Sequence, residues 1–325
     1  MTTPSVTFDL TPEQEASKLQ FIRRQFSGAP PAVARADVDL EGQTALVTGA
    51  NGGIGLECCR QLLGLGVGNL VLAVRDEHKG EIARETLMAD KCRASQNVEV
   101  WRLDYASYES VTEFARRAES VQPPLGIAVL NAAVNRASFA LNPETGHEED
   151  VQTNYLSTAL LTLLLLRTFK TTSDASPSQG PGHIVLVSSD TAAWANFAEK
   201  TQDPLLPAFD EAPRFRTFDR YATTKLLGQL FVAELARRVP ASASAAAVVS
   251  CANPGLCHGS GLNRELGLPA AVFMRLLGRS AAVGARSMAP FVYSEEAKVV
   301  SQRLWKETMA ELSFAGVEKI VQDLS

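Results

Sequence analysis

A strand-like run that leads directly into a glycine-rich turn, at residues 44–57, constrains this chain more than any other feature. The run Thr-Ala-Leu-Val-Thr ends at Gly49, and apolar residues with helical spacing follow Gly55. Strand, glycine turn and helix in this order are what a dinucleotide-binding βαβ unit requires. Glycines in an ordinary strand–helix turn give a similar pattern, so the rest of the chain has to decide between the two.

The glycines of this turn have separate predicted tasks. Gly49 permits the tight turn out of the strand, Gly53 lets the backbone approach a pyrophosphate, and Gly55 lets the helix pack close to the strand. The helix N-terminus then offers free N–H groups and the positive end of its dipole to the phosphates. The predicted cofactor-binding residues of the turn are Gly49, Asn51, Gly53, Ile54 and Gly55.

Further apolar runs alternate with helical segments along the rest of the chain. They cover residues 69–74, 98–103, 127–130, 183–187 and 246–251. Nearly continuous apolar strands are typical of parallel sheets covered on both faces, and right-handed crossovers connect them. We therefore predict an α/β, single-domain Rossmann fold: a doubly wound parallel sheet flanked by helices on both faces. The domain is predicted over 41–325, after an N-terminal appendage at 1–40.

In such a sheet, ligands bind at the carboxyl ends of the strands. Gly49, Arg75, Asp104 and Asn131 stand at successive strand ends. An arginine that closes the second strand can pair with the 2′-phosphate of NADP, whereas an acidic residue there favours the ribose hydroxyls of NAD. Arg75 comes first after the apolar run, so the sequence favours NADP(H). Asp76 leaves NAD as the alternative cofactor. An arginine that is only solvated at the strand end is the alternative to a phosphate contact.

Composition excludes several classes of function. The chain of 325 residues has a net charge of −5 and no dense Lys/Arg cluster, which argues against nucleic-acid binding. Five cysteines without CxxC spacing indicate reduced thiols, and four scattered histidines predict no metal site. The apolar stretch 156–166 is too short to span a bilayer, and the N-terminus lacks the parts of a signal peptide. We expect a cytoplasmic protein without a membrane span.

Two segments are predicted to border the site. A helix over 12–26, capped by Thr11 and with Leu19, Ile22 and Phe26 on its apolar face, packs outside the core or covers an entrance; a partly ordered tail is the alternative. The segment 190–220 follows a strand end and is expected to form an irregular active-site loop, the wall or lid of the site. Its aromatic residues are Trp194, Phe197, Phe209, Phe215 and Phe218.

A set of short motifs then indicates which family the chain resembles. They are the glycine turn, Asn131-Ala132-Ala133, Asn154, Ser188-Ser189, Tyr221-x-x-x-Lys225 and Asn253-Pro254-Gly255. In these residues and their order, over roughly residues 40–290, the chain resembles the short-chain dehydrogenase/reductase superfamily. It is similar to its retinol-dehydrogenase-like and fungal secondary-metabolism reductases.

Physical chemistry and the resemblance agree on the catalytic roles. Tyr221 and Lys225 share one helix face, and a nearby ammonium stabilises the phenolate of a tyrosine whose free pKa is about 10. Tyr221 is then the proton donor to a carbonyl, or the base in the reverse reaction. The resemblance implies that Ser189 holds the substrate oxygen and that Asn154 positions a water that connects Lys225 to solvent.

The resemblance also implies a set of cofactor contacts. Lys225 would bond to the nicotinamide ribose, Asp104 would accept from the adenine amine, and Asn131 would lie near the adenosine ribose. Tyr221 and Pro254 complete the predicted cofactor-binding set.

Departures from the family pattern lie mainly beyond Pro254. Ser260 stands where a threonine is usual, and the C-terminal part is short, with only residues 291–293 left for a seventh strand. The segment 256–325 is expected to supply substrate-side helices, including helices over 262–277 and 294–312.

The resemblance implies an NADP(H)-dependent oxidoreductase that reduces a carbonyl, or oxidises the alcohol, in secondary metabolism. The aromatic residues of the segment 190–220 indicate a bulky, largely apolar small molecule as its substrate. A non-redox cofactor-binding or scaffold protein is the alternative. Wide apolar faces on the helices with Asn154 and Tyr221 are consistent with a homodimer, or with helices that simply cover the sheet.

Overall fold

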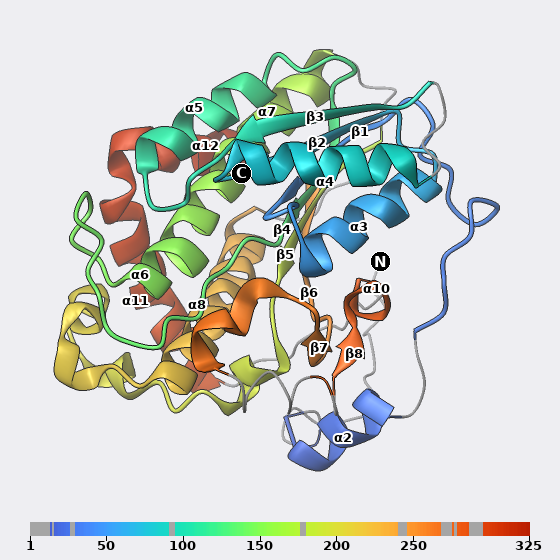
Figure 1. The fold of residues 1–325 in the computed structure, drawn as a ribbon. Coiled ribbons are helices and arrows are strands. Elements are labelled where there is room, and N and C mark those ends of the chain that lie inside the picture. The colour runs from blue at the N-terminus through green and yellow to red at the C-terminus, as the bar shows by residue number, and fades with distance from the viewer. Residues whose placement is uncertain are drawn as a thin grey trace, which may run out of the picture.

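The computed structural model describes residues 14, 16–26, 30–90, 95–175, 180–239, 246–267, 275, 278–285 and 295–325. Its centre is a six-stranded parallel sheet in the order β3-β2-β1-β4-β5-β6 (Figure 1). The strands are β1 (Thr44–Thr48), β2 (Asn69–Val74), β3 (Asn97–Arg102), β4 (Leu125–Leu130), β5 (Gly182–Val187) and β6 (Ala247–Ala252). The doubly wound sheet predicted from the sequence is confirmed.

Helices cover both faces of this sheet. On one face lie α3 (Gly53–Gly64) and α4 (Glu77–Ala89). On the other lie α5 (Tyr108–Ala118), α7 (Ser157–Ala175) and α8 (Thr217–Arg238). Side chains of β1 alternate between two cores, since Ala45 and Val47 pack with α3 and α4 while Leu46 packs with α5 and α7. Because every residue of β1 is buried, its strand reads as one apolar run.

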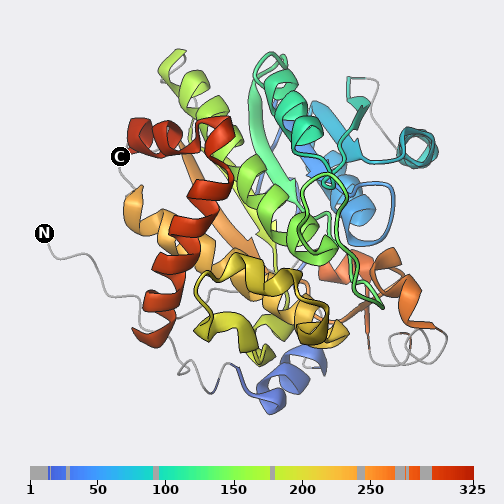
Figure 2. The same cartoon turned by 90° about the vertical axis from the view of Figure 1, so that its left-hand side faces the viewer.

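The C-terminal helices extend the second core. The helix α11 (Glu295–Glu311) packs against α8, and α12 (Val317–Leu324) packs against α7 after the short turn η7 (Ser313–Ala315) (Figure 2). The helices α11 and α12 therefore cover parts of the apolar faces of α7 and α8. These parts of the two faces are thus used within the chain and are not left for a homodimer. The helix α12 was not predicted from the sequence.

The segment between β5 and α8 is more regular than expected. It contains four 3-10 helices, which are η2 (Asp190–Trp194), η3 (Ala198–Thr201), η4 (Leu206–Asp210) and η5 (Ala212–Arg214). Phe197 and Phe209 stack on each other with ring centroids 6.0 Å apart, and both are buried in the core. These two aromatic rings are thus not free to line a lid, because they anchor the segment to the domain.

The N-terminal helix differs from its prediction. The helix α2 (Lys18–Phe26) begins after Ser17, whose Oγ accepts from Gln20 N at 3.1 Å; the expected cap Thr11 lies outside the described residues. The predicted apolar face is exposed: Leu19, Ile22 and Phe26 are 50–61% accessible. Helical spacing alone cannot tell which face of a short helix meets the protein.

Past β6, the described chain forms a small second sheet. The strand β7 (Cys257–His258) pairs in parallel with β8 (Arg279–Ser280). The 3-10 helix η6 (Gly261–Leu266) lies between these strands in the chain, and α10 (Ala281–Gly284) follows β8 directly. The helix expected over 262–277 is 3-10 helix at its start and lies mostly outside the described residues, as does the seventh strand expected at 291–293. Within the described parts of the chain, no helix has the length and apolar character needed to cross a bilayer.

Candidate active site

The glycine turn between β1 and α3 has the expected geometry. Gly49 has a φ of +66°, a conformation that favours glycine, and ends β1. A Cβ on Gly55 would meet Gly49 O and lie 2.7 Å from Asn131 Nδ2, so only glycine allows this close packing of α3 on the strand. A Cβ on Gly53 would lie 2.9 Å from Ser260 Cα. The segment after β7 therefore passes directly over the turn.

A groove of about 270 Å³ opens at the carboxyl ends of β1, β2 and β3. It is lined by four of the predicted cofactor residues: Gly49, Asn51, Arg75 and Asp104. Arg75 is exposed in this groove. Asp104 keeps the loop after β3 in shape, because its Oδ1 accepts from Ala106 N at 3.0 Å.

Asp76 has a different partner from the one that an NAD site would require. Its Oδ1 accepts from Lys79 N at 3.2 Å, and its carboxylate pairs with the Lys79 ammonium. These two hydrogen bonds, the backbone one first, hold the pKa of Asp76 below its usual range. Asp76 thus caps α4, which leaves Arg75 as the side chain of this strand end that lines the groove.

Asn131 ties two strand ends together. Its Nδ2 donates to Thr48 O at 2.9 Å and to Gly49 O at 3.4 Å, while Thr48 Oγ1 accepts from Asn131 N. The side chain therefore holds the glycine turn against β4. Its contact with an adenosine ribose stays a prediction.

Ser189 and Tyr221 meet at the end of β5. The Ser189 hydroxyl lies close enough to lower the pKa of the Tyr221 phenol, and Ser189 Oγ accepts from Thr191 Oγ1 at 2.9 Å. The neighbouring Ser188 is buried, and its Oγ accepts from Gln229 Nε2 at 2.7 Å. Of the two serines, only Ser189 is placed to act beside the tyrosine.

Lys225 lies one turn further along α8, close to the same ring. Its Nζ is 5.7 Å from the centre of the Tyr221 ring and donates to Val187 O at 2.8 Å. Burial lowers the pKa of Lys225 to about 8. Burial also raises the pKa of Tyr221, and the bond from Ser189 only partly opposes this rise. Burial thus dominates the pKa of Tyr221 in this structure, and the lowering effect expected from Lys225 stays a prediction.

Asn154 lies in a π-helical turn, η1 (Gln152–Leu156), between the short helix α6 (Glu149–Val151) and α7. Its Oδ1 accepts from Val134 N at 2.8 Å, and its Nδ2 donates to Val134 O and Thr224 Oγ1. The side chain thus joins the loop after β4 to α8. Asn154 and Lys225 also line a cavity of about 20 Å³, and a polar cavity of this size can hold one water.

Comparisons with known proteins agree with this geometry. The family model described as short chain dehydrogenase matches residues 43–199. The short-chain dehydrogenase fogG of Aspergillus ruber is 43% identical, over 99% of this chain and 99% of that protein. The chain belongs to the short-chain dehydrogenases.

Further relatives support this assignment. The short chain dehydrogenase/reductase mfmJ of Annulohypoxylon moriforme is 35% identical over 94% of each chain. Among solved structures, a short-chain dehydrogenase from Sphingobium yanoikuyae in complex with NADPH has a TM-score of 0.54 at 19% identity, over 75% of this chain and 81% of that one. At this identity the structural likeness shows the shared fold.

The short-chain dehydrogenase fold brings most predicted site residues into two groups. The groove collects Gly49, Asn51, Arg75 and Asp104, and the end of β5 collects Ser189, Tyr221, Lys225 and Asn154. Ile54 lies in the first turn of α3, half-buried. Pro254 O accepts from the Cys257 thiol at 3.4 Å, a contact within its own loop. The cofactor contacts of Ile54 and Pro254 stay predictions.

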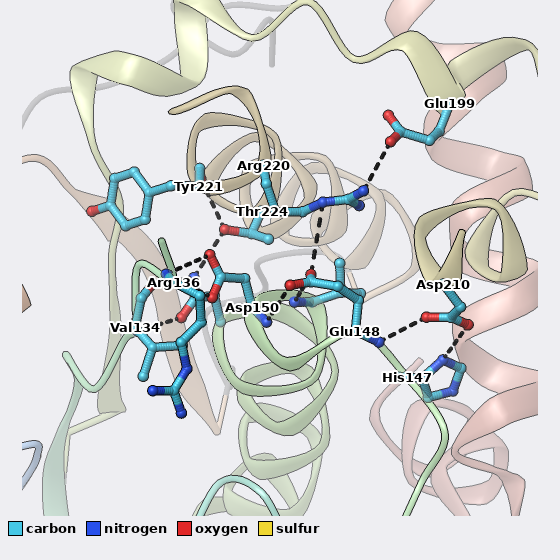
Figure 3. Close-up of polar contacts among 12 residues, drawn as sticks. Val134, Arg136, His147, Glu148, Asp150, Glu199, Asp210, Arg220, Tyr221 and Thr224 are labelled. Atoms are coloured by element: carbon cyan, nitrogen blue, oxygen red, sulfur yellow. Dashed lines mark hydrogen bonds and ion pairs between the residues drawn. The ribbon is translucent and has the colours of Figure 1, made fainter. Parts of the chain in front are cut away.

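A buried ionic network behind Tyr221 was not predicted. Arg220 reaches Glu148 at 3.7 Å and Glu199 at 3.1 Å (Figure 3). Its guanidinium lies over the Phe209 ring. The network joins α8, the residues before Asn154 and the 190–214 segment of this short-chain dehydrogenase. Burial and the charge of Glu148 raise the pKa of Asp150 to about 8. A charged residue directly before Tyr221 on a mostly buried helix was the available signal in the sequence.

His147 extends this network to α11. Its Nδ1 lies 3.1 Å from Asp210 Oδ2 (Figure 3), and its Nε2 lies 3.2 Å from Glu311 Oε1. Burial alone would lower the pKa of His147, but the bonds to both carboxylates outweigh it and raise the pKa to about 9. The charged imidazolium thus connects η4 and α11.

We expect His147→Gln to cost about 2 kcal/mol of unfolding free energy near neutral pH, since charge-assisted bonds are lost. A folded-state pKa of about 9, above the ordinary 6.5, gives stability that is full below about pH 6.5 and is lost as the pH rises through about 9. Urea unfolding below about pH 6.5 and above about pH 9 measures this change in unfolding free energy. The substitution of an exposed histidine, His183→Gln, is the control. An equal cost at both extremes would show that His147 acts through packing instead.

Proposed function

We propose that this short-chain dehydrogenase uses NADP(H) to reduce a carbonyl of a bulky, largely apolar small molecule, or to oxidise the corresponding alcohol. The observation that carries the proposal is the placement of Ser189 beside Tyr221, with Lys225 at the same strand end. These groups can hold a carbonyl oxygen and deliver a proton to it.

The residues around the groove fit a nicotinamide dinucleotide. The positive φ of Gly49 and the close packing at Gly55 leave backbone N–H groups at the start of α3 for a pyrophosphate. Arg75 would pair with a 2′-phosphate, and Asp104 would bond to the adenine. When bound, the cofactor supplies the hydride. The NADPH complex of the Sphingobium relative is consistent with this choice of cofactor.

The proton steps follow from the states of the chain's own groups. Because burial raises the pKa of Tyr221, the phenol keeps its proton at neutral pH and can donate it. Ser189 would hold the substrate oxygen in the orientation that receives this proton. The charge of Lys225 would then stabilise the phenolate, and a water in the adjacent cavity would return a proton from solvent.

The substrate side supports a bulky apolar molecule less strongly than the sequence suggested. Phe197 and Phe209 belong to the core, but Trp194 is half-buried in η2, and Phe215 packs against Phe139 with ring centroids 6.1 Å apart. The proposal of a secondary-metabolite substrate rests on the resemblance.

A homodimer is also proposed, and light scattering on the purified protein tests it.

The test of the reaction is NADPH consumption with a panel of ketones and aldehydes, followed by product identification. Turnover with a bulky apolar ketone and little with small polar ones supports the proposal. Tight binding of NADPH without turnover of any carbonyl or alcohol would favour the non-redox scaffold instead.

The pH profile of reduction tests the role of Lys225. With a pKa of about 8, Lys225 is charged below that pH and loses its charge above it. We therefore expect kcat/KM for reduction to fall about tenfold per pH unit above about pH 8. In Lys225→Arg the charge persists at high pH, so the fall should move upward. The same profile in both proteins would exclude Lys225 as the titrating group.

A further inference from the structure

The helix α2 lies beside the carboxyl end of the sheet, next to β7, β8 and the segment after β5 (Figures 1 and 2). It precedes the part of the chain that the family model matches. Its exposed face carries Leu19, Ile22 and Phe26, so its contacts with the domain are made by other residues. These contacts reach both segments that follow catalytic or cofactor-binding motifs.

Gln25 makes the most specific of these contacts. It is buried, with an exposed fraction of 7%. Its Nε2 donates to Leu256 O at 2.9 Å, and its Oε1 accepts from Leu256 N at 3.2 Å. The Gln25 amide thus bonds to both the N–H and the C=O of Leu256, which lies two positions after Pro254. Gln25 O also accepts from Arg279 Nε at 3.2 Å.

The same helix also holds the segment after Ser189. Arg24 pairs with Asp190 at 2.8 Å, and Asp190 is the next residue after Ser189. The ring of Phe21 meets Trp194 edge-on, with centroids 5.0 Å apart, and Trp194 Nε1 donates to Ala16 O at 2.9 Å. Three contacts therefore fix η2 to α2 and to Ala16, just before this helix.

These two sets of bonds connect segments that begin at neighbouring strands: β5 and β6 are paired up to Val187 and Ala252, and Ser188 N donates to Ala252 O at 2.7 Å. One begins with Ser189, and the other begins with the Asn253-Pro254-Gly255 turn and continues over Gly53 through Ser260. A substrate carbonyl at Ser189 and Tyr221 would lie between them. Beyond the paired ends of β5 and β6, α2 therefore forms a second connection between the two segments.

We propose that α2 is a clasp across the substrate site and that Gln25 is a positioning residue, which sets substrate affinity by holding Leu256. The inference rests on the proposed carbonyl reduction for its kinetic part only. Gln25 touches no reacting group, so its loss should change how well a carbonyl substrate binds more than how fast it reacts. Binding of NADPH along the groove should change little.

The test compares Gln25→Leu, which removes both bonds to Leu256, with Gln25→Glu, which keeps the acceptor for Leu256 N–H. Chymotrypsin cleavage after Leu256, followed by mass spectrometry, reports the loop without needing turnover. We expect cleavage about tenfold faster in Gln25→Leu, as two hydrogen bonds are lost, and less acceleration in Gln25→Glu. Unfolding midpoints check that the domain itself stays folded.

Kinetics with 2-decalone as the probe ketone give the second readout. We expect KM for 2-decalone to rise about tenfold in Gln25→Leu, with kcat and the Kd for NADPH within about twofold. Adjacent arginines provide matched controls: Arg24→Ala should shift KM in the same direction, and the exposed Arg23→Ala should not.

Wild-type cleavage rates at Leu256 in Gln25→Leu would overturn the clasp, as would a loss confined to kcat. If cleavage accelerates but the parent protein reduces neither 2-decalone nor any other carbonyl, the clasp is supported and the proposed function is what fails.

Discussion

We expect the replacement of Tyr221 with phenylalanine to lower kcat for the proposed carbonyl reduction by about a thousandfold, within the range that general acid catalysis contributes. The substitution removes the phenol that meets Ser189 and leaves the ring in place. Because the ring and Lys225 remain, we expect the Kd for NADPH to change by no more than about threefold, less than one ordinary hydrogen bond. Stopped-flow or steady-state NADPH consumption measures the first quantity, and fluorescence titration measures the second.

The matched control is Tyr108→Phe, which removes a phenol that bonds to Glu311 at 3.2 Å, away from the end of β5. It should leave kcat near the parent value. Turnover that survives Tyr221→Phe would rule out the proposed proton donor. A residual rate that depends on Ser189 would point to that hydroxyl as the acid instead.

Replacing Arg75 with alanine should weaken NADPH binding by about 10- to 100-fold and leave NADH binding almost unchanged. The range corresponds to the loss of one or two charge-assisted bonds to a 2′-phosphate. Arg75 lines the groove, whereas the alternative reader Asp76 is engaged with Lys79 at the start of α4. Dissociation constants for both nucleotides, measured at one fixed ionic strength, provide the comparison.

Arg102→Ala is the control for this experiment. Arg102 is an exposed arginine at the end of the neighbouring strand β3 and does not line the groove. Its replacement removes the same charge and should affect both nucleotides equally and weakly. Equal losses for NADPH and NADH in Arg75→Ala would show that Arg75 does not read the 2′-phosphate.

The glycine turn and the strand ends were predictable because their chemistry is local. The φ of Gly49 and the packing at Gly55 are consequences of a strand that turns directly into a helix. Parallel strands then place Gly49, Arg75 and Asp104 at one edge, because their carboxyl ends meet there. No knowledge of other contacts is needed for these placements.

Other features depend on partners that are distant in the sequence. The orientation of α2 depends on Leu256, which is 231 positions from Gln25. The burial of Phe197 and Phe209 depends on Arg220 and the core behind it. Spacing within a segment gives an apolar face or an aromatic-rich loop, but which neighbour it meets is decided by the fold of the whole chain.

The sequence by itself determined the class of fold, the position of the glycine turn and the residues that stand at the strand ends, because each follows from local pattern and from the geometry of parallel strands. Only the tertiary structure decided which residues α2 contacts, how Arg220 joins Glu148 and Glu199, and in which direction the pKa values of Tyr221 and Lys225 move. These last properties depend on burial and on the charges of residues brought together by folding, and electrostatic free energies change steeply with both.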